Sequence, residues 1–162
     1  MIFKLMQRFL NRIAYFAPGG YSFRPQLHRL RGVHIGKNVW ISQYVYIDEL
    51  HPSGVTIGDN SSIGIQTSII THFYWGPVRS DDHAGKVHIE ENVFVGPHCV
   101  ILPGVHIGKG SVIQAGTVVS RNVPSETVWG NPKSGPIAKA TIPLTADFSY
   151  EEFVKGLRPI RK

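Results

Sequence analysis

The sequence predicts an all-β fold of the parallel β-helix type, and three observations lead to this class. First, residues 87–122 divide into six consecutive blocks of six residues without a gap: VHIEEN, VFVGPH, CVILPG, VHIGKG, SVIQAG and TVVSRN. Second, the third residue of each block is Ile or Val, and the first is β-branched or small. Third, the 162 residues include 17 Gly and 11 Pro, which indicates many turns. Because side chains two residues apart point to the same side of an extended chain, positions one and three face one interior, and a fixed period of six is typical of a β-helix.

Residues 1–16, MIFKLMQRFLNRIAYF, predict an amphipathic helix. The apolar residues lie on one helical stripe, with Lys4, Arg8 and Arg12 on the other side. These charges interrupt the segment too often for a signal peptide or a membrane span. Two uses of the helix remain open: it covers part of the solenoid or a neighbouring subunit, or it lies on an anionic membrane surface. A basic lead-in, which has the composition of a solvated face, completes an N-terminal region of residues 1–32.

The solenoid is predicted over residues 33–132. Three blocks fill residues 33–50 and three more fill residues 55–72, so insertions at 51–54 and 73–86 separate three groups of blocks. With three blocks per turn, the chain forms a triangular prism of about four coils. Both insertions then leave the prism at the same corner, one coil apart, or about 4.8 Å along the axis. Since a solenoid needs no loop for stability, the long loop is a candidate functional element.

The C-terminal tail covers residues 133–162. Within it, SYEEFVKGL at residues 149–157 predicts a short helix, because Ser149 and Glu152 form a capping box. We expect this helix to pack on the prism or on a neighbour and to take no part in catalysis.

The chain is basic, with a formal charge of +6 and a pI near 9.6. Such a charge favours nucleic acid, an acidic membrane surface, or an anionic small molecule such as a nucleotide cofactor. The sequence has no nucleic-acid-binding motif and no clustered basic helix, so nucleic acid is not an expected partner. The single cysteine, Cys99, excludes a disulfide framework and a thiolate zinc cluster, and its inward block position marks it as a small core residue.

Several motifs within residues 33–132 resemble those of a known family. They are IGDN at residues 57–60, ITH at residues 70–72, the ENVFVG and ILPGVHIGKG runs, and AGTVVSRNVP followed by WGNP at residues 129–132. The pattern is similar to the hexapeptide-repeat acyltransferases with a left-handed β-helix, and more narrowly to sugar O-acetyltransferases related to galactoside and maltose acetyltransferases. The tail SGPIAKATIPLT is similar to members that act on bacterial surface polysaccharides. The resemblance implies a left-handed coil, acetyl-CoA as co-substrate, no metal requirement, and a homotrimer with active sites in the grooves between subunits.

The resemblance also implies a catalytic base at the turn into the long loop, where this sequence has His72. A neutral imidazole near pH 7 suits the deprotonation of a sugar hydroxyl and can return the proton to the leaving thiolate. Such a base needs an orienting carboxylate. Four acids are near, and the choice among Asp48, Glu49, Asp81 and Asp82 stays open. We assign His72, Glu49 and Asp81 as the catalytic candidates, since Glu49 has the best stacked position and the loop acids have the best flexibility.

Residues for the acceptor and the cofactor follow from the same resemblance. The acceptor candidates are Ser42, Asp48 and His83, and Ser42 departs from the Asn that the family has there. Small side chains on a late corner would let the pantetheine arm approach backbone donors, and cationic side chains would meet the phosphates. The cofactor candidates are Phe94, Pro97, Ala115, Gly116, Ser120, Arg121 and Lys133.

The resulting hypothesis is an enzyme that moves an acetyl group from acetyl-CoA to a sugar hydroxyl in bacterial surface polysaccharide biosynthesis. We expect it to be cytoplasmic, with peripheral contact to the inner face of the membrane through residues 1–16 as an open alternative. Two other functions are kept. One is a γ-class carbonic anhydrase that binds zinc through His72, His83 and His88. The other is a non-enzymatic scaffold for envelope assembly.

Overall fold

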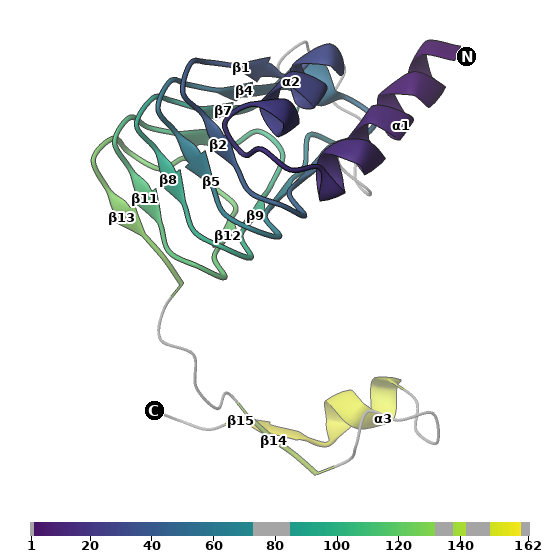
Figure 1. Ribbon diagram of the computed structural model, residues 1–162. Coiled ribbons are helices and arrows are strands. Elements are labelled where there is room, and N and C mark those ends of the chain that lie inside the picture. Colours follow the sequence, from purple (N-terminus) through teal and green to yellow (C-terminus); the bar gives the residue numbers. More distant parts are fainter. Residues whose placement is uncertain (1, 73–84, 132–137, 142–149, 160–162) are drawn as a thin grey trace. The chain divides into compact units, whose positions relative to one another are not determined.

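The computed structural model of the chain (Figure 1) describes residues 2–72, 85–131, 138–141 and 150–159. Contacts divide the chain into two compact units, Met1–Asn131 and Pro132–Lys162, and each is described by itself. No helix within the described ranges is long and apolar enough to cross a membrane.

The first unit is a left-handed parallel β-helix, as predicted. Its short strands stack into three parallel sheets that form the faces of a prism (Figure 1). Sheet A contains β1 (His34–Ile35), β4 (Val55–Ile57), β7 (Val87–Ile89) and β10 (His106–Ile107). Sheet B contains β2 (Trp40–Ile41), β5 (Ser62–Ile63), β8 (Phe94–Val95), β11 (Val112–Ile113) and β13 (Val128–Trp129). Sheet C contains β3 (Tyr46–Ile47), β6 (Ser68–Ile69), β9 (Val100–Ile101) and β12 (Val118–Val119).

The core consists of the inward side chains that the six-residue pattern predicts. Equivalent positions stack directly on one another between coils, as in the pairs Ile57↔Ile89 and Ile69↔Ile101. These Ile and Val side chains are almost wholly buried, and each contributes about 1.5–3 kcal/mol through removal of apolar surface from water. Ile35 and Trp129 are partly buried against this cluster, and they come from the first and the last coil.

The backbone conformation at the corners of the prism explains which residue types occupy the sixth position of each block. Its residue takes a left-handed backbone conformation at nine corners, where Asn and Gly are common because they tolerate a positive φ. The residues are Asn38, Tyr44, Asn60, Gln66, Asn92, His98, Gly104, Gly110 and Gly116. Leu50, His72 and Asn122 occupy the same position without this conformation, at the corner where sheet C passes into sheet A. We call this the C–A corner, and both insertions leave the prism there, as predicted.

The stack extends beyond the twelve blocks that the sequence pattern identifies. Val123 bridges to Ile107, and β13 pairs with β11 through Val112↔Val128. This last coil is two residues shorter than the preceding one, whose register is Phe94↔Val112. The shortened corner breaks the six-residue period, which is why the repeat pattern ended at Asn122.

Two helices precede the prism, α1 (Ile2–Phe16) and α2 (Phe23–Leu30), and they pack on each other and on strands of the first coil. The second helix corrects the expectation of a solvated basic lead-in. Arg24, His28 and Arg31 are buried instead. Arg24 donates hydrogen bonds to the carbonyl oxygens of Ala17 and Ile41 at 2.5 and 2.6 Å, so buried cations are satisfied by backbone oxygens of the turn and the first coil.

The second unit contains the predicted short helix, α3 (Tyr150–Lys155), which is confirmed within residues 149–157. An antiparallel pair, β14 (Ala138–Ala140) and β15 (Leu157–Pro159), accompanies it.

Candidate active site

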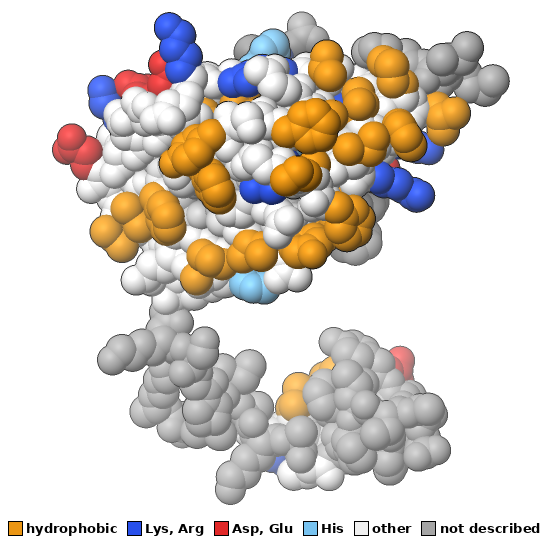
Figure 2. All heavy atoms as spheres, viewed as in Figure 1, with side chains coloured by type: hydrophobic (Ala, Val, Ile, Leu, Met, Phe, Trp, Pro, Cys, Tyr) orange, Lys and Arg blue, Asp and Glu red, His pale blue; other side chains and the backbone are white. Residues whose placement is uncertain are grey.

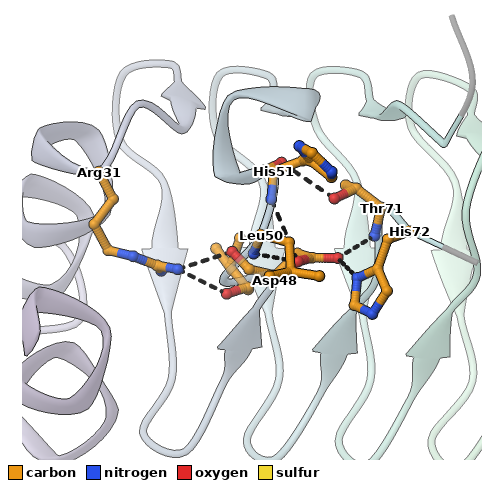
Figure 3. A network of polar contacts seen from close by, with 7 residues as sticks. Arg31, Asp48, Leu50, His51, Thr71 and His72 are labelled. Atoms are coloured by element: carbon orange, nitrogen blue, oxygen red, sulfur yellow. Dashed lines mark hydrogen bonds and ion pairs between the residues drawn. The ribbon is translucent and has the colours of Figure 1, made fainter. Parts of the chain in front are cut away.

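A buried carboxylate lies at the C–A corner, at the point where β3 ends. Asp48 is completely shielded from solvent. Its Oδ1 accepts hydrogen bonds from the backbone N–H groups of Leu50 at 2.7 Å and His51 at 3.5 Å, and its Oδ2 accepts one from the N–H of Thr71 at 2.7 Å (Figure 3). The carboxylate therefore joins the start of the first insertion to the next coil, just before the long loop.

His72 is the fourth partner of this carboxylate, since its Nδ1 lies 2.5 Å from Asp48 Oδ2 (Figure 3). Burial raises the pKa of Asp48, but the hydrogen bonds from Thr71, His72 and Leu50 outweigh it and bring the pKa below its ordinary value. Because Asp48 is then ionised and can accept but not donate, the Nδ1–H of His72 must be the donor. A neutral His72 consequently carries its lone pair on Nε2, which makes that nitrogen the basic atom.

The side chain of His72 is 13% exposed, so part of it remains accessible to solvent. The hydroxyl of Thr71 donates to the carbonyl oxygen of His51 at 3.1 Å, which ties the first insertion to the strand that leads to His72. Gly85, where the described chain resumes, has a φ of +82°, and a Cβ there would collide with the carbonyl oxygen of Thr71. Thr71 therefore lies in close contact with the first insertion on one side and with the end of the long loop on the other.

Arg31 supports the corner from the side of the helices. Its side chain is completely buried, and Nη2 donates to the carbonyl oxygens of Ile47 at 3.0 Å and Asp48 at 2.8 Å (Figure 3). Burial, together with the charges of Arg31 and Arg24, lowers the pKa of His28 to about 3. His28 is therefore neutral, and its Nδ1 accepts a hydrogen bond from Arg31 at 2.9 Å. Arg31 was not among the predicted site residues, because nothing in a basic stretch of sequence indicates a buried guanidinium.

Of the two candidate acids that the structure describes, Asp48 and Glu49, only Asp48 contacts His72. Asp48, which we had assigned to the acceptor, is the residue that holds His72. Glu49, which we had assigned to catalysis, instead lies with α1, 3.8 Å from Arg8 Nε and 3.4 Å from Asn11 Nδ2, so that assignment is corrected. Successive side chains of an extended segment point in opposite directions, and a one-residue difference therefore separates the two carboxylates.

One signal in the sequence could have narrowed the choice to Asp48 or Glu90, the two acids at the fourth position of a block. The fourth residue is Gly in several other blocks, as in IGKN and IGDN. Asp81, Asp82, His83 and Lys133 lie outside the described residues.

The predicted cofactor residues divide between two corners of the prism. Pro97, Ala115 and Gly116 lie where sheet B passes into sheet C, here called the B–C corner, and the N–H of Gly116 donates to the carbonyl oxygen of Pro97 at 2.8 Å. Phe94 on β8 is exposed. Ser42 follows β2 at the same corner in the first coil.

A groove of about 460 Å³ includes Ser42, Phe94 and Pro97 in its lining. It joins the acceptor candidate of the first coil to two of the cofactor candidates. In contrast, Ser120 and Arg121 follow β12 at the C–A corner and are exposed. Within one chain, His72 and Arg121 therefore share one corner, while Ser42, Phe94 and Pro97 share another.

A separate group of ligand-type side chains lies on the outer face of sheet A. His88, Glu90 and His106 place their ligand atoms within 4.8 Å of one another, and this is the one such group among the described residues. Glu90 Oε2 already accepts a hydrogen bond from the backbone N–H of Lys109 at 2.6 Å. Its Oε1 lies 2.8 Å from His106 Nε2. The group does not contain His72, and His83, the third histidine of the carbonic anhydrase alternative, lies outside the described residues.

The chain is similar in sequence to known acetyltransferases. Residues 86–121 match the family model described as bacterial transferase hexapeptide, six repeats. The candidate acetyltransferase YvoF of Bacillus subtilis is 38% identical over 99 residues, which are 60% of this chain and 56% of that protein. A galactoside O-acetyltransferase of Lactococcus lactis is 33% identical over 110 residues, which are 63% of this chain and 51% of that protein. This chain spans about half the length of the curated relatives that it matches.

A solved structure shows the same fold. It is the hexapeptide-repeat acetyltransferase of Vibrio cholerae in complex with acetyl coenzyme A, with a TM-score of 0.62 at 23% sequence identity. The likeness covers 80% of this chain and 82% of that one.

Proposed function

We propose that this protein transfers an acetyl group from acetyl-CoA to the hydroxyl of a sugar. The proposal is supported by the bacterial transferase hexapeptide repeat in the chain and by its similarity to galactoside O-acetyltransferases. The observation that carries this proposal is the Asp48–His72 pair at the C–A corner. It provides a histidine with a fixed tautomer, a buried anionic partner and a partly exposed ring, placed where the long loop begins. The supporting resemblance of the tail points to a bacterial surface polysaccharide as the acceptor.

The chemistry follows from the tautomer of His72. Nε2 takes the proton of the acceptor hydroxyl while the hydroxyl oxygen forms a bond to the carbonyl carbon of the acetyl group. Backbone N–H groups hold the negative charge that develops on the carbonyl oxygen. The carbon–sulfur bond then breaks, and the coenzyme A thiolate receives the proton from Nε2 of His72. Asp48 stays ionised throughout and stabilises the imidazolium that forms between these steps.

The direct test is an assay of free thiol released from acetyl-CoA with a panel of sugar acceptors. The enzyme releases thiol in an acceptor-dependent manner, whereas a non-enzymatic scaffold releases none. We expect the rate to be unchanged after divalent metals are removed with a chelator, since none of the proposed steps involves a metal. Loss of CO2 hydration on zinc removal, with no thiol release in either state, would favour the carbonic anhydrase alternative.

We propose a homotrimer, because the predicted site residues are divided between two corners of one chain. A neighbour whose B–C corner faces the C–A corner would bring Phe94 and Pro97 to His72 and Arg121. Apolar outward side chains on sheets B and C support such contacts. They are Phe94, Val100, Val112 and Val118, and three of the four are exposed in the single chain. We expect light scattering at micromolar concentration to give three times the 18.0 kDa chain mass, and the mass of one chain would contradict the trimer.

Arg121→Ala is expected to weaken coenzyme A binding more than acceptor binding. The guanidinium is exposed at the C–A corner, and a phosphate of the cofactor is the group that its planar fork recognises. Losing one charge-assisted contact should cost about 1.5–3 kcal/mol of binding free energy. Calorimetric titration with coenzyme A measures this, with Lys37→Ala, an exposed cation at the corner between sheets A and B, as the control. An unchanged dissociation constant would remove Arg121 from the cofactor site.

A further inference from the structure

Helix α1 leaves several large apolar side chains exposed. Leu5, Phe9 and Phe16 are 69%, 64% and 65% exposed, and Met6 beside them is 44% exposed. The face that packs on the rest of the unit has Asn11 and Ala14 buried, with Leu10 and Ile13 partly buried beside them. An ordinary surface helix turns its apolar stripe to the core, whereas α1 also carries large apolar side chains on its exposed side. In Figure 2 apolar side chains gather over the part of the surface where α1 and α2 lie in Figure 1. A contiguous apolar face of this kind marks a docking surface.

The charges of α1 indicate what covers that face. The helix carries Lys4, Arg8 and Arg12 and no acidic residue. Arg8 and Arg12 are exposed beside the apolar side chains. Exposed apolar side chains flanked by cations are the composition of a helix that lies in the surface of an anionic bilayer, where the apolar groups enter the acyl boundary and the cations meet the headgroup charge. The formal charge of the whole chain, +6, acts in the same direction.

Helix α1 is joined to the candidate active site through Arg31 and Glu49. Gln7 Nε2 donates to the carbonyl oxygen of Arg31 at 3.1 Å, and Arg31 donates to the carbonyl oxygen of Asp48. Arg8 and Asn11 contact Glu49, the residue after Asp48. An open hollow of about 700 Å³ lies between the exposed face of α1 and this corner, lined by Leu5, Met6, Arg8, Phe9, Arg12 and Glu49. A surface that covers α1 therefore lies beside the corner that holds His72.

We infer that α1 binds the surface of an anionic lipid bilayer and that the acceptor is a saccharide attached to a lipid in that bilayer. The second half of this inference rests on the proposed acetyl transfer, and the first half does not. The physical basis is that α1 and Asp48 are joined by the contacts of Gln7, Arg31 and Glu49, so docking of the helix brings the C–A corner to the height of the lipid headgroups.

The test is co-sedimentation of the full chain with vesicles of equal parts phosphatidylglycerol and phosphatidylcholine, compared with vesicles of phosphatidylcholine alone. We expect the wild-type chain to prefer the anionic vesicles. The double variant Leu5→Ser with Phe9→Ser should bind them at least tenfold more weakly, because two large side chains no longer enter the acyl region. Arg12→Gln should reduce binding about fivefold, the effect of one cation near a charged surface. Val154→Ser on α3, which removes an exposed apolar side chain elsewhere, should bind like the wild type.

Acetyl transfer gives the second readout. The double variant should transfer acetyl to a water-soluble sugar at the wild-type rate and should lose transfer to a lipid-linked saccharide in anionic vesicles. Equal sedimentation of the wild type with anionic vesicles and with no vesicles would overturn the inference while leaving the proposed enzyme intact. A smaller assembly mass of the double variant in light scattering would also overturn it, since a second copy of the chain would then be the partner of this face. Vesicle binding without thiol release from any acceptor would retain the bilayer surface and reject the lipid-linked acceptor together with the enzyme.

Discussion

His72→Ala is expected to abolish measurable acetyl transfer while coenzyme A still binds. Removal of a general base typically costs about 10²–10⁴ in rate. The loss should appear in kcat, because Nε2 acts on the proton of the acceptor as the transition state forms and holds neither substrate in the ground state. Folding should survive, since His72 is a corner residue with a partly exposed side chain and is not a member of the hydrophobic core. Thiol release with a sugar acceptor measures the rate, and calorimetry measures coenzyme A binding.

A matched control is available at the same corner. His51 is exposed, and the hydrogen bonds recorded for it use its backbone, so His51→Ala should keep the wild-type rate. The prediction is contradicted if His72→Ala keeps full turnover. Should His83→Ala lose activity in that case, the base belongs to the long loop instead of the prism.

Asp48→Asn is expected to reduce kcat by a similar factor, about 10²–10⁴, although the base itself is retained. The amide NH2 of Asn would face Nδ1 of His72 and donate to it, which favours the tautomer with the proton on Nε2. The nitrogen that faces the acceptor would then be a donor and could not take a proton. Coenzyme A binding should be unchanged. Glu49→Gln is the control, because the Glu49 carboxylate contacts α1 and not His72, and a loss of kcat in that variant equal to the loss in Asp48→Asn would contradict the assignment.

The same substitution should lower the free energy of unfolding. The buried N–H of Thr71 would lose its anionic acceptor, which costs about 1–3 kcal/mol. The pKa of Asp48 is lower in the folded chain than its ordinary value, so the ionised form stabilises the fold. This stability is fully present above the unfolded-state pKa of about 3.9 and is lost as the pH falls through the lower folded-state value. Urea unfolding should therefore show a difference between wild type and Asp48→Asn that is constant near pH 7 and shrinks below about pH 4.

Most of the fold could be predicted because a six-residue sequence repeat specifies it. Each block places the same residue types at the same positions, and parallel stacking brings equivalent positions together without a choice of register. The two insertions could be assigned to one corner by counting blocks. Counting blocks did not identify the last coil, because one of its corners is two residues shorter. The inward position of Trp129 is therefore out of phase with the six-residue repeat.

The site was predictable in part. A histidine at the turn into the loop follows from the resemblance and from chemistry. In the structure, the ring of His72 contacts the carboxylate of Asp48. Which carboxylate it is could not be read from the sequence, since Asp48 and Glu49 are adjacent and the direction of each side chain depends on where the strand ends. Whether the site residues on the two corners meet is likewise a property of the assembly of chains.

The sequence by itself determined the repeat, the inward-facing core and the corner that carries both insertions, because each of these depends on spacing along one chain. The tertiary structure decided that Asp48 holds His72, that Arg31 is buried behind it, and that Leu5, Phe9 and Phe16 of α1 are exposed. The physical reason is that these features depend on contacts between distant segments. A guanidinium finds its partners in the carbonyl oxygens of another coil, and an amphipathic helix has two faces whose partners its own sequence does not specify.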